Sequence, residues 1–239
     1  MKNALNQRNQ VIWLALFVCL SATLQVSAEP VGQATRIQRF AYQTPINTNR
    51  QALYRFGAIH RDAVLETVTS GALQATFLDG SVLTLGSSSK ITVDKFVYTQ
   101  SDGDQQTIKL TQGLFRFISG NMPKSKVRLL TPTVSIGIRG TILKIRVKAD
   151  GAADVFFEHG QGFVENQQGR KVDVVEGELL EVASDGTFSQ PRKSALHLGD
   201  HAVDQGLQAF GSIFGGPGAG SGGSGASAVQ SGPRDAASP

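Results

Sequence analysis

The sequence predicts an all-β fold, and three observations support this prediction. Short runs alternate apolar and polar side chains, as in 73–77, 91–98 and 134–138, which is the pattern of half-buried strands. Asp-Gly pairs and single glycines punctuate these runs as turn signals. The central part of the chain has no long segment with the period of a helix. We therefore expect a β-roll or a short solenoid-like sandwich of consecutive hairpins, spanning residues 29–190.

The first 28 residues have the pattern of a signal peptide. Lys2 and Arg8 give a positive start, and an apolar run follows at 11–20. The small residues at 26–28 then suit a signal peptidase, so we place cleavage before Glu29. The apolar run is too short to span a bilayer comfortably. We predict export, with no stable membrane span after cleavage.

Charge and cysteine content narrow the classes of partner. Removing Lys2 and Arg8 with the signal peptide lowers the formal net charge from +4 to +2. The remaining charges are interspersed, which argues against a nucleic-acid partner. Cys19 is the only cysteine and lies within the predicted signal peptide. The mature chain therefore has no disulfide and no thiolate chemistry.

The C-terminal part of the chain changes its pattern after residue 190. Four apolar residues are spaced as on one helix face: Val203, Leu207, Phe210 and Phe214. We predict an amphipathic helix over residues 191–214 that caps the β core, with a partner- or membrane-docking helix as the alternative. Residues 215–239 hold eight glycines and three prolines and no aromatic residue. We predict a disordered Gly/Ser-rich tail there.

The sequence offers no convincing reactive centre. His197 and His201 have a metal-ligand spacing, but Gly199 lies between them and no third ligand is evident. Glu158 and His159 suggest a glycosidase only superficially, because nothing fixes the separation that its two carboxylates need. We predict no metal, no cofactor and no enzyme activity, with a hydrolase as a remote alternative.

The segment Gly137-Ile138-Arg139-Gly140 resembles an anion-binding loop in composition only. A phosphate loop needs a following helix, whereas the β-branched residues of 141–147 predict a strand. We expect a bulge or a tight crossover here. Arg139 then either pairs with a nearby carboxylate or carbonyl, or contacts a partner.

Four blocks of the sequence together resemble one known family. They are His60–Tyr98 with its Asp-Gly-Ser turn, Leu110–Gly120, Val127–Val147 with Thr-Pro and Gly-Ile-Arg-Gly-Thr, and Val174–Gly186. This combination resembles the FecR domain of bacterial envelope proteins. The resemblance covers roughly residues 55 to 190.

The resemblance implies a recognition function. Well-understood members of the FecR family are inner-membrane regulators that sense an outer-membrane iron-siderophore transporter and control a sigma factor. This chain resembles a stand-alone exported form, without the anti-sigma and transmembrane segments. We expect it in the periplasm or at the surface of a Gram-negative bacterium, or secreted, where it recognises or scaffolds another envelope protein. A cell-wall or glycan-binding module is the alternative, and the partner and oligomeric state stay open.

The resemblance also implies roles for five residues. Asp79, Gly80, Gly137 and Gly140 would be architectural, because they occupy the turn and glycine positions of the family's motifs. Arg139 is the candidate contact residue for the partner.

Overall fold

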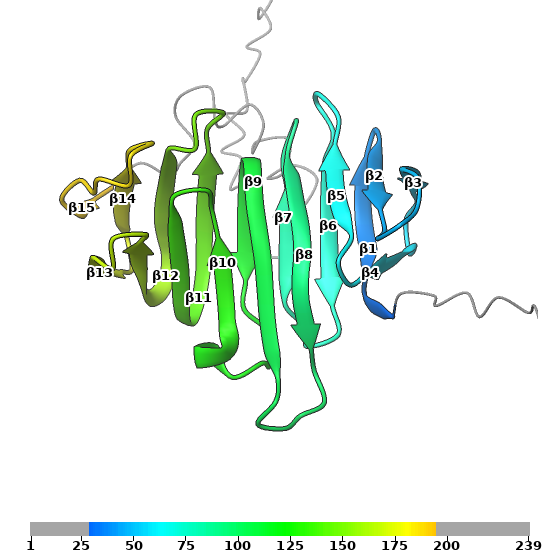
Figure 1. Ribbon diagram of the computed structural model, residues 1–239, viewed down its shortest axis with the longest axis horizontal. Coiled ribbons are helices and arrows are strands. Elements are labelled where there is room, and N and C mark those ends of the chain that lie inside the picture. The colour runs from blue at the N-terminus through cyan, green and yellow to red at the C-terminus, as the bar shows by residue number, and fades with distance from the viewer. Residues whose placement is uncertain (1–28, 195–239) are drawn as a thin grey trace, which may run out of the picture.

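The computed structural model describes residues 29–194, which form fifteen β-strands and one short 3-10 helix (Figure 1). Hydrogen bonds join all the strands into one open sheet. The predicted all-β fold is confirmed. The predicted signal peptide, residues 1–28, and the predicted tail, residues 215–239, lie outside the described residues.

The strand pairing folds this sheet into two layers that share three long strands. The long strands are β9 (Gln105–Ile118), β11 (Val134–Val147) and β12 (Ala153–Asn166). Layer 1 adds β2 (Ala41–Thr44), β3 (Gln51–Leu53), β5 (Val64–Thr67), β8 (Lys90–Val97), β10 (Val127–Leu130) and β13 (Lys171–Val175). Layer 2 adds β1 (Pro30–Gln38), β4 (Ala58–His60), β6 (Ala72–Phe77), β7 (Val82–Leu85), β14 (Glu178–Val182) and β15 (Arg192–Lys193).

Each long strand passes from one layer to the other, as β9 illustrates. Its first half pairs with β8 and β10, and its second half pairs with β7 and β11. Ile108 and Leu110 are buried in the first half, whereas Phe115 and Phe117 are buried in the second. The buried side of the strand therefore changes from even to odd positions, as expected where a strand bends around a core.

Glycines with positive φ lie at these bends. Gly140 on β11 has φ +69° and Gly160 on β12 has φ +80°, a conformation that side chains with a Cβ disfavour. A Cβ on Gly160 would also overlap the carbonyl oxygen of Gly140. The two bends therefore pack backbone against backbone, which lets β11 and β12 turn together.

The core lies between the two layers. The rings of Phe77 on β6 and Phe96 on β8 stack across it, with their centroids 5.6 Å apart. Phe115, Phe117 and Phe157 are among the largest fully buried side chains. Burying each such ring contributes about 1.5–3 kcal/mol, so apolar packing between the layers stabilises the domain.

Two expectations about the fold need correction. Consecutive hairpins explain only part of the sheet, because β9 and β10 pair in parallel after a crossover containing η1 (Lys124–Lys126), and β1 lies between β4 and β6. The helix predicted from residue 191 does not begin there: β15 is extended because its backbone pairs with the edge of β14. The rest of that predicted helix, residues 195–214, lies outside the described residues.

Candidate partner-binding surface

The outer face of layer 1 carries a row of aligned residues across four neighbouring strands. Strand register places Arg128 on β10 opposite Gly137 on β11, Gly137 opposite Phe163 on β12, and Phe163 opposite Asp173 on β13. The residues beside them in sequence, such as Leu129, point into the core and are buried. Alternation along the strands therefore directs the whole row outward.

Phe163 is a half-buried aromatic ring on this outward row. It lies over Gly137, where a Cβ would overlap the ring, so the glycine makes room for it. The Lys171 ammonium lies 3.6 Å from the ring centroid and the Arg128 guanidinium 5.3 Å from it. Cations over an aromatic face gain about 0.5–1 kcal/mol at exposed sites. Phe163 therefore contacts both cations.

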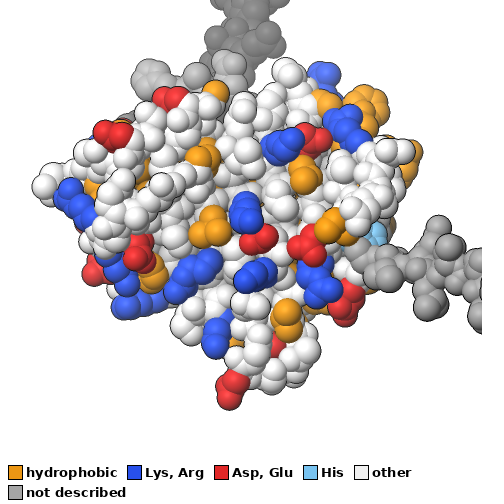
Figure 2. Space-filling model, in the orientation of Figure 1, with side chains coloured by type: hydrophobic (Ala, Val, Ile, Leu, Met, Phe, Trp, Pro, Cys, Tyr) orange, Lys and Arg blue, Asp and Glu red, His pale blue; other side chains and the backbone are white. Residues whose placement is uncertain are grey.

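These cations have no carboxylate partner within the described part of the chain. Arg128 donates from Nη1 to the carbonyl oxygens of Ser125 and Val127, 3.2 and 3.0 Å away. Lys171 and Arg139 make no ion pair with any residue in 29–194. We call Arg128, Arg139, Phe163 and Lys171 the cation–aromatic surface. Figure 2 shows basic side chains spread across the middle of this face, with fewer acidic ones between them.

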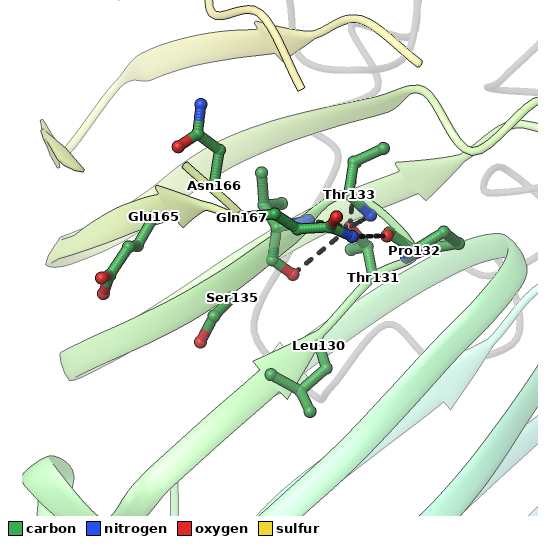
Figure 3. A pocket seen from close by; sticks show the side chains of 9 residues that line it. Leu130, Thr131, Pro132, Thr133, Ser135, Glu165, Asn166 and Gln167 are labelled. Atoms are coloured by element: carbon green, nitrogen blue, oxygen red, sulfur yellow. Dashed lines mark hydrogen bonds between the residues drawn. The ribbon is translucent and has the colours of Figure 1, made fainter. Parts of the chain in front are cut away.

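A shallow pocket of about 390 Å³ adjoins this surface (Figure 3). Its outward strand residues are Leu130, Ser135 and Glu165, each next to the row described above. The turn at 131–133 forms its wall and is held by the Gln167 side-chain amide, which donates to the Pro132 carbonyl oxygen at 2.9 Å. In Figure 3 the Glu165 carboxylate points away from this turn. The pocket can therefore accept an apolar side chain, and its carboxylate is not placed for catalysis there.

Arg139 lies at the bend of β11, directly before Gly140. It is exposed and stands opposite Gln161 on β12. By alternation from Ser135 and Gly137, its side chain lies on the outer face of layer 1. The structure therefore brings Arg139 and Gly137 onto the surface that also contains Phe163.

Asp79 and Gly80 lie apart from this surface, in the turn between β6 and β7. The Asp79 carboxylate accepts hydrogen bonds from the backbone N–H and the hydroxyl of Ser81, at 3.0 and 2.6 Å. The Ser81 hydroxyl in turn accepts from the Gln106 amide at 3.0 Å. Gly80 has φ +79°. This buried network ties the turn of layer 2 to β9.

On the outer face of layer 2, two carboxylates pair with basic side chains. Glu158 accepts from Arg116 at 2.9 Å and lies 3.9 Å from Lys144. The buried carboxylate of Asp154 accepts from Arg146 Nε at 2.7 Å, and it lies 3.5 Å from Lys148. Each carboxylate therefore lies between two cations.

The residues that the sequence suggested as catalytic or metal-binding do not form a reactive site within residues 29–194. His159 forms an exposed pair with Glu176, with 2.8 Å between Nδ1 and Oε2. Residues 29–194 contain no group of three or more His, Cys, Asp or Glu side chains that could hold a metal ion. The pair His197 and His201 lies outside that range. Within the described part of the chain, no helix has the length and hydropathy that a membrane crossing requires.

Sequence reasoning missed Arg128, Phe163 and Lys171. Phe163 follows Gly162 and precedes the buried Val164, so alternation along the strand could have predicted that its side chain points outward. The contacts among the three residues depend on the register of four strands, which the sequence does not specify.

Comparison with known proteins places this two-layer β domain in a class. Residues 63–180 match the model of the family described as FecR protein. This segment is a FecR domain, as the sequence predicted.

Other comparisons add little to this assignment. No curated protein matches the chain. Two crystal structures of a "putative anti-sigma factor" from Parabacteroides distasonis ATCC 8503 are similar, each with 15% identity and a TM-score of 0.46. The match covers 55% of this chain and 59% of that one, so this chain spans less than two thirds of that protein.

Proposed function

We propose that this FecR domain is a non-catalytic recognition module that binds another protein of the cell envelope and takes part in envelope signalling. The observation that carries the proposal is the cation–aromatic surface: cations that make no ion pair within residues 29–194, carried on strands next to a shallow pocket. Such a surface offers charge to a partner without the geometry of a reaction. The expected location is the periplasm or the cell surface of a Gram-negative bacterium.

The strand framework of layer 1 supports this role. A binding surface on strands loses little conformational freedom when a partner docks, and pre-organisation of this kind strengthens association. Charged groups at the rim of an interface mainly steer the partner and set specificity. The exposed Arg139, at the end of the surface, suits that task.

The test is cross-linking of the full chain in its native host, followed by mass spectrometry of the envelope fraction. We expect one envelope protein to be enriched with the natural chain, and Arg139→Ala to reduce its yield about fivefold, which corresponds to about 1 kcal/mol. Arg55→Ala is the matched control, since Arg55 is an exposed arginine in the β3–β4 turn. Equal yields from Arg139→Ala and the natural chain, with equal thermal midpoints, would contradict the proposal.

A further inference from the structure

We infer that the cation–aromatic surface binds an extended acidic segment of the partner protein. This inference rests on the proposed function and names the chemistry of its partner. The segment would lie along β11 on the outer face of layer 1. The side chains of the segment that point toward the sheet would contact Arg139 first, then Arg128 and Lys171 beside Phe163. The last of them would enter the pocket beside Ser135.

The positions of the cations argue for carboxylate groups. Both Arg128 and Lys171 lie over the Phe163 ring, so these side chains lose less freedom than unsupported ones when a carboxylate binds them. Only Nη1 of Arg128 makes hydrogen bonds within residues 29–194, which leaves Nε and Nη2 free to donate. Hydrogen bonds between charged groups of this type are about twice as strong as neutral ones.

The spacing along β11 argues for an extended segment. Ser135, Gly137 and Arg139 are alternate residues on one face of the strand, so their rows lie about 7 Å apart at about 3.4 Å per residue. Alternate side chains of an extended partner have the same spacing. One carboxylate would therefore reach Arg139, the next would reach Arg128 and Lys171, and the third side chain would enter the pocket.

The third side chain of the segment should be aliphatic. Leu130 and Pro132 line the pocket, and Glu165 stands beside it. A carboxylate would be repelled by Glu165, whereas an aliphatic group would gain contact with Leu130. The partner segment should therefore contain acidic residues at alternate positions, followed two residues later by a leucine, isoleucine or valine.

The surroundings of Phe163 disfavour a glycan on the same surface. Sugars bind proteins by lying flat on an open aromatic face. Here the ring lies against Gly137, and the Lys171 ammonium covers it at 3.6 Å. The ring therefore serves to position cations and has little free surface for stacking.

The test uses synthetic peptides and the full chain. A labelled peptide with a Glu-x-Glu-x-Leu core is titrated by fluorescence anisotropy, next to a Gln-x-Gln-x-Leu peptide and an oligogalacturonate. We expect the acidic peptide to bind at least about tenfold more tightly than the glutamine peptide, a difference of about 1.4 kcal/mol. Its affinity should fall as salt rises from 50 to 300 mM, as expected when salt screens exposed charges.

Matched variants locate the binding site. Arg128→Gln with Lys171→Gln should weaken the acidic peptide about tenfold or more. Arg55→Gln should leave its affinity unchanged, although the Arg55 guanidinium also lies over a phenylalanine ring, 4.5 Å from the centroid of the exposed Phe56. Lys171→Gln alone changes only one exposed side chain on an edge strand. It provides a folded variant if the double substitution is unstable.

Several results would overturn the inference. These are equal affinities for the acidic and glutamine peptides, equal effects of the Arg55 and Lys171 variants, or tighter binding of oligogalacturonate than of the acidic peptide. If these results appear while Arg139→Ala still reduces cross-linking to the envelope partner about fivefold, the acidic-segment inference fails and the proposed function stands. If no envelope protein is cross-linked at all, the proposed function itself fails.

Discussion

Basic residues on the outer faces of the two layers have different surroundings at two places: around Glu158 and Asp154 on layer 2, and around Phe163 on layer 1. On layer 2, Glu158 and Asp154 each lie between two cations. On layer 1, Arg128 and Lys171 lie against an aromatic ring and have no carboxylate partner among residues 29–194. These charges of layer 2 are satisfied within the domain, whereas Arg128 and Lys171 of layer 1 remain available to a partner.

This difference shows why a count of charges says little about function. The chain is only weakly basic, and both faces contribute to that balance. What distinguishes Arg128 and Lys171 from the paired cations is the placement of carboxylates, which depends on strand register. A surface whose cations already have carboxylates gains little from an acidic partner, because binding would exchange one ion pair for another.

The largest predicted effect concerns the bends that create the two faces. Gly160→Ala should destabilise the domain by about 3 kcal/mol, because an alanine at φ +80° is strained by about 1–2 kcal/mol and its Cβ would overlap the Gly140 carbonyl oxygen. Urea unfolding followed by circular dichroism measures the free energy of unfolding.

Gly140→Ala is the matched control for this prediction. Gly140 has φ +69°, yet a Cβ there would meet no atom within 4 Å. Only the backbone strain remains, so we expect a loss of about 1–2 kcal/mol. Equal losses at the two positions would show that the close approach of the two bends adds nothing to the cost of a Cβ at Gly160.

A smaller effect is expected from the charges of layer 2. Asp154→Ala should lower the free energy of unfolding by about 2 kcal/mol, since hydrogen bonds to charged groups contribute about 1.5–3 kcal/mol and the Asp154 side chain is only 3% exposed. Glu181→Ala removes an exposed pair with Arg192 and should cost no more than about 1 kcal/mol. If Asp154→Ala were neutral, the charges of layer 2 would not be structural.

The sequence was sufficient for the strands because their side chains alternate between core and solvent. Ile91 and Val93, for example, are predicted and observed to be buried. The sequence was insufficient to predict the division of the sheet into two layers. A strand that bends keeps its apolar residues, and only the positions that are buried change from even to odd. At residue 191 an apolar period predicted a helix, but the edge of β14 offered backbone partners that favoured an extended β15.

The candidate site was predictable only along one strand. The Gly-Ile-Arg-Gly pattern of β11 drew attention to Arg139, which the structure places on the outer face of layer 1. Arg128, Phe163 and Lys171 come from three other strands, and their contacts arise only when register aligns them. A cluster of this kind has no local sequence pattern, so long-range pairing is needed to find it.

The smallest predicted effect compares paired and unpaired cations within layer 1. Burial raises the pKa of the Glu66 carboxyl, but hydrogen bonds and positive charge from Lys90 and Arg50 outweigh this and hold that pKa below its ordinary value of 4.5. A carboxyl whose pKa is lowered by folding stabilises the folded state above its unfolded pKa. That contribution disappears as the pH falls through the folded-state value.

Glu66→Gln should therefore reduce stability at pH 7 by no more than about 1 kcal/mol, because the pair is partly exposed. Below pH 4.5 the difference from the natural chain should shrink toward zero as Glu66 becomes protonated. Urea unfolding at pH 7, 5 and 3 measures this difference. A Lys171→Gln variant should show no such convergence, because no carboxylate in residues 29–194 pairs with Lys171. A convergence of similar size there would mean that a carboxylate of the domain does neutralise Lys171.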